Sequence, residues 1–199
     1  MSTPAGWTNF GPVQGPPGPA GPPGSQLTVD TVLQASPAPS AFGQVTQQFQ
    51  VNAADLASNR MLRVHGFGNL RAGATSSVVE FRFVLGTLVL ASLGIGTVAI
   101  EANAVYQWSL TGILLTGVQA GQARAALAGS FGPDTGINHA PAVNSEQTAM
   151  GLVGANAYVT LPDPLPPVTT VNLQGRHSTS YANQALTGFG STYEHGPGS

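Results

Sequence analysis

Catalytic or metal-binding chemistry in this chain would have to come from histidines and carboxylates, because the sequence contains no cysteine. The four histidines are His65, His139, His177 and His195, and no short spacing among them predicts the convergence that a metal site needs. Eight carboxylates are present, but no pattern brings two together as glycoside hydrolysis requires. We therefore expect no catalytic residue, no metal and no cofactor, and we expect that the protein is not an enzyme.

The charge content excludes several other classes of protein. Charged residues make up 7% of the 199-residue chain, against about 25% in an average soluble domain. The net charge is -2, and all six basic residues are arginines scattered along the chain, so no nucleic-acid-binding surface is expected. The hydrophobic content of 42% is high enough for a core. The surface must then be made polar by uncharged residues or be buried against other subunits.

Neither an export signal nor a membrane span is expected. The first residues lack the basic region and apolar stretch of a secretory signal. Residues 83–100 form an uncharged run of nearly spanning length, but this run contains Gly86, Gly94 and Gly96. Two buried strands joined by a turn fit this composition better than a membrane helix.

Residues 15–26 have a glycine at every third position. Four Gly-X-Y triplets begin at Gly15, Gly18, Gly21 and Gly24, and five of their eight other positions are proline. Three polyproline-II strands wound together have space at their axis only for glycine, so this repeat predicts a collagen-like stem. A stiff single-chain spacer is the alternative. Twelve residues reach only about 37 Å, so a triple helix this short needs another clamp between the chains downstream.

Residues 27–195 read as one all-β head, preceded by an extended arm at 1–14 and followed by a tail at 196–199. Apolar or alternating segments rich in Val, Thr, Phe, Tyr and Leu recur between Gly, Pro, Asn and Ser. A short helical turn is expected at 52–57, a long loop at 132–146 and a rigid connection at 162–167. The predicted strands are Leu27–Thr31, Thr46–Val51, Met61–Leu70, Ser77–Leu85, Thr87–Leu93, Ala104–Leu115, Arg124–Ser130, Ala149–Leu161, Thr169–His177 and Gln184–Tyr193.

Alternation within these strands indicates which faces are buried. In 77–85, Val79, Phe81, Phe83 and Leu85 share one face, and Val78, Glu80, Arg82 and Val84 share the other. Tyr106, Trp108 and Leu110 also share a face. If 61–70 and 77–85 pair as neighbours, Arg63 or His65 would lie opposite Glu80 or Arg82. Arg63, Glu80 and Arg82 would then form either an ion cluster on a subunit face or an ordinary solvated face. About ten antiparallel strands with long crossing loops predict a sandwich, most plausibly a jelly roll.

The chain resembles trimeric fibre and decoration proteins of tailed bacteriophages, with a head similar to tumour-necrosis-factor-like jelly rolls. The segments that carry the resemblance are 60–68, 78–86, 170–176 and 185–189, together with the stem. The resemblance implies a homotrimer that assembles through one sheet face of the head. It also implies that the arm docks on the phage capsid or tail, and we expect Trp7 and Phe10 to be its apolar anchors. We expect a virion-surface protein made in the host cytoplasm. The short arm and stem favour the capsid, as a decoration or head-fibre protein.

Two alternatives keep the same architecture. The head could bind a receptor or surface glycan at the tip of a tail fibre, through the loops at 132–146 and 178–183. His139 and Tyr181 would be the candidate contacts, because loops on a rigid sandwich often carry recognition. Collagen-like filament proteins of spore surfaces, which also assemble without export, are the second alternative.

Overall fold

The structure, a computed structural model, describes residues 26–30, 40–57, 59–71, 76–99, 105–119, 122–133, 150–177 and 185–197. The predicted arm at 1–14 and the stem up to residue 25 lie outside the described residues, as does most of the loop predicted at 132–146.

Almost all of the described chain is β-strand, with one short helix. The elements are β1 (Gln26–Asp30), β2 (Gly43–Gln44), β3 (Phe49–Asn52), the 3-10 helix η1 (Ala53–Leu56), β4 (Arg60–Arg71), β5 (Ser76–Leu85), β6 (Leu88–Ala99), β7 (Val105–Gln119), β8 (Gln122–Pro133), β9 (Met150–Thr160), β10 (Val168–His177) and β11 (Ala185–Pro197). The all-β prediction and the helical turn after Asn52 are confirmed. β11 runs past His195, where the sequence predicts the head to end.

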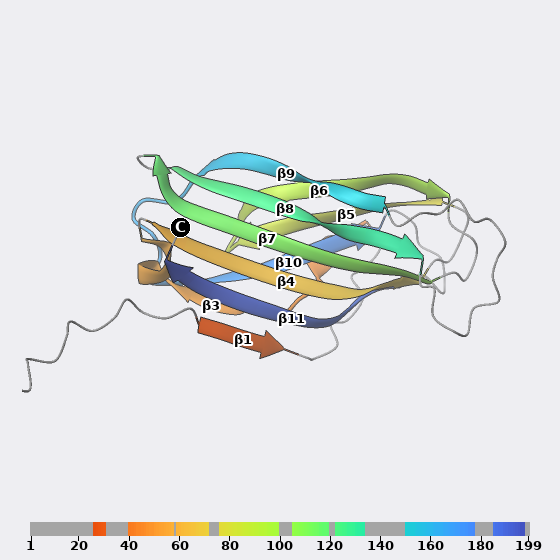
Figure 1. Ribbon diagram of the computed structural model, residues 1–199, viewed down its shortest axis with the longest axis horizontal. Coiled ribbons are helices and arrows are strands. Elements are labelled where there is room, and N and C mark those ends of the chain that lie inside the picture. The colour runs from red at the N-terminus through yellow and green to blue at the C-terminus, as the bar shows by residue number, and fades with distance from the viewer. Residues whose placement is uncertain are drawn as a thin grey trace, which may run out of the picture.

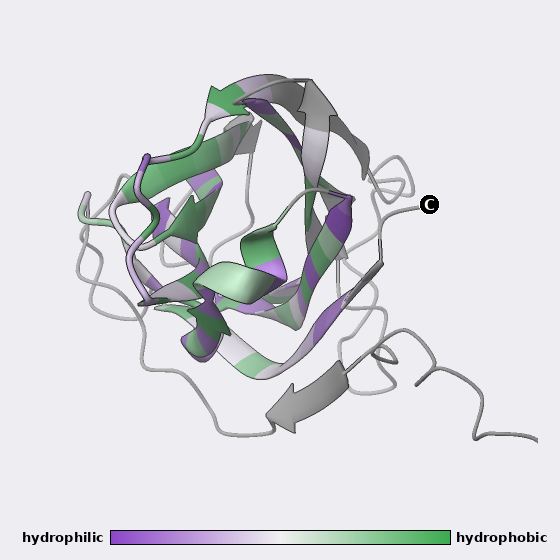
Figure 2. Ribbon diagram, turned by 90° about the vertical axis from the view of Figure 1, so that its left-hand side faces the viewer, coloured by the Kyte–Doolittle hydropathy of each residue, from purple (hydrophilic) through white to green (hydrophobic). Residues whose placement is uncertain are grey.

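The strands form two antiparallel sheets that face each other (Figure 1). The six-stranded sheet has the order β1-β11-β4-β7-β8-β9. The five-stranded sheet has the order β2-β10-β5-β6, with β3 pairing to β10 as well. β6 also contacts β8 and β9, which closes one side of the sandwich. In the end-on view of Figure 2 the strands surround a common interior.

Strand alternation places the core as predicted. Val79, Phe81, Phe83 and Leu85 are all buried, and so are Tyr106, Trp108 and Leu110. Val84, which the pattern assigns to the outer face, is buried too, and the register of β5 against β6 shifts between Phe83 and Val84. Residues 83–99 form parts of two strands joined by a turn at Gly86, as predicted. No helix in the described ranges is long and apolar enough to cross a membrane.

The strands at 61–70 and 77–85 do not pair as neighbours. β4 pairs with β11 and β7 in one sheet, whereas β5 pairs with β10 and β6 in the other. Alternation requires only that one face of each strand be buried. Two strands in facing sheets satisfy that requirement as well as two neighbours do.

The strand predicted at Thr46–Val51 begins only at Phe49, because Thr46 interrupts the ladder. The backbone amides of Val45 and Thr46 both donate to the Leu173 carbonyl, at 3.1 and 3.4 Å. The Thr46 hydroxyl in turn accepts from the Leu173 amide at 2.8 Å. A side chain thus takes the place of a backbone acceptor, and β2 and β3 are two short strands along β10.

Trp108 links the two sheets at the centre of the core. Its ring packs on Phe81 of the opposite sheet, with centroids 5.4 Å apart, and its indole N–H donates to the Thr187 carbonyl at 3.2 Å. Gly68 lies directly beneath this ring. A Cβ added to Gly68 would lie 1.9 Å from the Thr187 oxygen and 2.7 Å from the indole. Both neighbours are held in place, so only glycine fits at this position.

We predict that Gly68→Ala destabilises the head. Overpacking a filled core typically costs about 1–3 kcal/mol, and chemical denaturation would measure that loss. Gly94→Ala is the matched control, because a Cβ there would meet only Glu80, at 3.9 Å. Its free energy of unfolding should change by no more than about 0.5 kcal/mol. Equal losses in the two variants would contradict the packing argument.

Candidate interaction surfaces

None of the site residues proposed from the sequence is in the described part of the chain. These are Trp7, Phe10, Gly15, Gly18, Gly21, Gly24, His139 and Tyr181. Their predicted roles therefore stay predictions, and the described head supplies two surfaces of its own.

The three described histidines lie apart from one another. His65 is on the outer side of β4, within 3.1 Å of the Thr111 hydroxyl. His177 is buried at the end of β10, and His195 lies 3.1 Å from the Asp55 carboxylate. Within the residues that the structure describes, no group of three or more histidines and carboxylates is placed to hold a metal ion.

The outer face of the six-stranded sheet gathers apolar side chains. We call this surface the six-strand face. Its apolar members on β4, β7 and β11 are half-buried or exposed, and they are Met61, Phe67, Ile113, Leu115 and Phe189. Phe67 is 45% exposed and Phe189 41%, and Phe67 pairs with Gly190, the residue after Phe189, at a β-bulge in β11. Large apolar side chains clustered on an exposed sheet often mark a protein interface.

The charged groups in the middle of the six-strand face compensate each other. The Arg63 guanidinium donates to the Glu194 carboxylate at 3.1 Å across the β4–β11 pair. The neighbouring cross-strand row is Thr192, His65 and Thr111, which carries hydroxyls and one imidazole. Two other arginines lie on this face in the described chain, Arg71 at the end of β4 and Arg124 on β8 beside Leu115, and both are exposed. Burying the middle of this face therefore requires little desolvation of unpaired charge.

The opposite sheet carries an arginine–aromatic cluster on its outer face. Two guanidinium carbons lie over the Phe42 ring, that of Arg82 at 4.0 Å and that of Arg176 at 4.6 Å from the ring centroid. Arg176 donates to Glu80 at 2.6 Å, and Arg82 donates to the Gln174 side chain at 2.7 Å. Cation–π contacts at exposed sites contribute about 0.5–1 kcal/mol each, so this cluster fastens the chain before β2 to the sheet.

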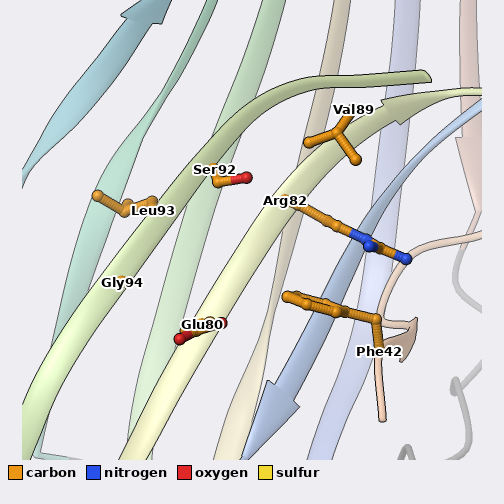
Figure 3. Close-up of a pocket in the computed structure, with 7 residues that line it drawn as sticks. All are labelled: Phe42, Glu80, Arg82, Val89, Ser92, Leu93 and Gly94. Atoms are coloured by element: carbon orange, nitrogen blue, oxygen red, sulfur yellow. The ribbon is translucent and has the colours of Figure 1, made fainter.

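A shallow pocket of about 340 Å³ adjoins this cluster (Figure 3). Its lining comes from the segment before β2 and from β5 and β6, and consists of Phe42, Glu80, Arg82, Val89, Ser92, Leu93 and Gly94. Two arginines and one glutamate leave the cluster with an excess of positive charge. The two surfaces of the head thus differ: one is apolar with paired charges, and the other is polar and cationic.

The ion cluster of Arg63, Glu80 and Arg82 does not form. Arg63 lies on the six-stranded sheet and pairs with Glu194, whereas Glu80 lies on the five-stranded sheet and pairs with Arg176. No local pattern in the sequence indicates Glu194 and Arg176, because their partners are more than ninety residues away in the chain. Only the pairing of β11 with β4 and of β10 with β5 reveals them.

Comparisons with known proteins show a likeness to solved structures but no family. No protein-family model matches the chain, and no curated protein matches it. Among solved structures, the chain is similar to the CBM2 module of the evolved Dit of Lactobacillus casei BL23 phage J-1. The identity is 12%, the match covers 84% of this chain and 89% of that chain, and the TM-score is 0.28. At so low a TM-score, the fold assignment rests on the strand pairing described above.

Proposed function

We propose that this protein is a non-enzymatic structural protein of a tailed-phage virion. In this proposal, three chains share a collagen-like stem at 15–26, and the arm at 1–14 docks on the capsid. The three β heads are displayed outward on the virion surface, as in a decoration or head-fibre protein.

The observation that carries the proposal is that the Gly-X-Y stem runs directly into the head. The fourth triplet ends at Gln26, and β1 begins at that same residue. β1 is an edge strand of the six-stranded sheet. Three chains wound about one axis bring their β1 strands close together, so the six-stranded sheets are the parts of the heads that the stem brings nearest to each other.

The composition of the six-strand face supports its use as the contact between heads. Phe67 and Phe189 provide exposed aromatic area, and Arg63 and Glu194 are already paired. Aromatic residues are enriched in protein interfaces, whereas unpaired charges are depleted from their cores. The face of the five-stranded sheet, with Arg82 and Arg176, then remains directed outward to solvent.

Strand order supports a jelly-roll head. The path β1-β11-β4-β7 lies opposite β3-β10-β5-β6, so the first and last strands pair and the chain crosses repeatedly between the sheets. β8 and β9 extend the six-stranded sheet beyond that eight-strand plan. Such crossing connections are typical of Greek-key sandwiches and jelly rolls.

Strand direction favours outward display and supports the second candidate function, receptor or glycan binding by a tail-fibre head. The stem enters at Gln26, which pairs with His195 at one end of the head. The antiparallel pairing places the last residues of β8 and β10 at the opposite end of the head from Gln26. The first residues of β9 and β11 lie at that same end. The loops that follow β8 and β10, at 132–146 and 178–183, are therefore attached at the end of the head away from the stem. A spore-surface filament remains the lesser alternative.

We predict that the full chain has three times the monomer mass in light scattering. Deleting residues 15–26 should leave a trimer if the heads hold together through the six-strand face. A monomer in both preparations would refute the trimeric proposal.

We predict that Phe67→Glu dissociates the heads of the protein that lacks residues 15–26. Three carboxylates would replace the aromatic rings of Phe67 in the proposed contact, and burying a charge there is strongly unfavourable. Val89→Glu is the matched control, since Val89 is exposed to a similar extent, 41% against 45%, but lies on the other sheet. Light scattering reports the mass, and a trimer that survives Phe67→Glu would exclude this face.

We predict that removing residues 1–14 abolishes incorporation into phage particles without changing the trimer. Particles assembled with the truncated chain would be purified and probed for it, and solution mass would show that the trimer persists. Normal incorporation of the truncated chain would exclude the arm as the anchor.

A further inference from the structure

A second pocket, of about 410 Å³, lies between β3 of the five-stranded sheet and β11 of the six-stranded sheet. It is separate from the two surfaces described above and lies at the end of the head where β1 begins, since His195 pairs with Gln26. Its lining comes from β3, the residues just before it, η1 and β11, and consists of Gln47, Gln48, Phe49, Gln50, Asn52, Asp55, Tyr193 and His195. The volume lies within the range of about 300–1,000 Å³ that is typical of small-molecule sites.

The buried hydroxyl of Tyr193 is the first feature that points to a ligand. Tyr193 is only 4% exposed, and its hydroxyl has no hydrogen-bond partner in the described part of the chain. Its ring is fixed between Phe49, with centroids 5.4 Å apart, and His195, 5.7 Å apart. A buried hydroxyl without a partner is unfavourable, and a ligand that supplied an acceptor would remove that penalty.

Asp55 is held in place at the side of this pocket. One carboxylate oxygen lies 3.1 Å from the His195 ring nitrogen. The other accepts hydrogen bonds from the backbone and side-chain amides of Asn52, at 3.1 and 3.3 Å. Burial, with a smaller contribution from Asp55, raises the pKa of the Tyr193 hydroxyl, so this group is a proton donor at neutral pH.

Amide side chains complete the lining. Gln48 and Gln50 are exposed, and their side chains make no hydrogen bond within the described part of the chain. A primary amide offers both donors and acceptors, and so matches a ligand with hydroxyl groups, which also donate and accept. No lysine or arginine lines the pocket, and the Asp55 carboxylate disfavours an anion. The rings of Phe49 and Tyr193 are almost fully covered, so an apolar ligand would find little surface.

We propose that this pocket binds a neutral saccharide, whose hydroxyl groups pair with the Tyr193 hydroxyl and with the amides of Gln48 and Gln50. Binding through hydrogen bonds without an exposed stacking platform is weak, so a single pocket has a Kd near the millimolar range. Three pockets on a trimer would strengthen binding to a repeating polysaccharide. The pocket is distinct from the loops at 132–146 and 178–183, and the proposal holds whether or not the head is carried on a virion.

The test uses the full chain and saturation-transfer NMR with glucose, galactose, rhamnose and N-acetylglucosamine, and glucuronic acid as the anionic comparison. At least one neutral sugar should bind. Tyr193→Phe should then weaken the binding of that sugar by about five- to tenfold, which is the effect of losing one hydrogen bond. The melting temperature of this variant should be unchanged or higher, because the deleted hydroxyl has no partner in the free protein. Tyr158→Phe, on an exposed tyrosine outside the pocket, is the matched control and should leave the affinity unchanged.

Three results would overturn the proposal. The first is that none of the four neutral sugars binds at tens of millimolar. The second is that glucuronic acid binds more tightly than all of them. The third is that Tyr193→Phe lowers the melting temperature while sugar binding is unaffected, which would mean that the hydroxyl serves the fold. Gln50→Ala provides an independent check, because it removes an exposed amide without disturbing the aromatic stack. This variant should bind the same sugar more weakly. None of these results bears on the mass of the trimer or on incorporation into particles.

Discussion

The head depends on the contact between its two sheets at Trp108. The indole fills the space between β7 and the opposite sheet, and it can do so only because Gly68 has no side chain. Its N–H bonds the carbonyl of Thr187, next to the bulge that places Phe189 on the outer face. One buried side chain therefore fixes the spacing of the sheets and also the strand geometry on which the six-strand face depends.

The few charged residues of the chain are distributed differently on the outer faces of the two sheets. Arg63 is neutralised by Glu194 on the six-strand face, whereas Arg82 and Arg176 stack on Phe42 on the other sheet. In the proposed trimer, a stem that joined three chains at β1 would place the apolar face inside and the arginine face outside. The same arrangement would leave few charged groups to be desolvated on assembly.

The second pocket, between β3 and β11, differs from both faces because its polar groups are already held in place without a ligand. Asp55 is fixed by Asn52 and His195, and the Tyr193 ring is fixed by its aromatic neighbours. Groups fixed in this way lose little entropy when they bind, which favours recognition of a weakly interacting ligand.

The sequence alone determined the all-β class and the buried faces of individual strands, and it contains the Gly-X-Y repeat from which the stem is proposed. Each of these follows from a local rule: a glycine at every third residue, or a side-chain alternation with period two. Pairing was not determined, because alternation in β4 and β5 is satisfied equally by neighbouring strands and by facing sheets. Only the tertiary structure could bring Glu194 to Arg63, Arg176 to Glu80, and Tyr193 to the amides near β3. Those contacts join residues that are distant in the chain, and strand order, which no local pattern encodes, decides which of them meet.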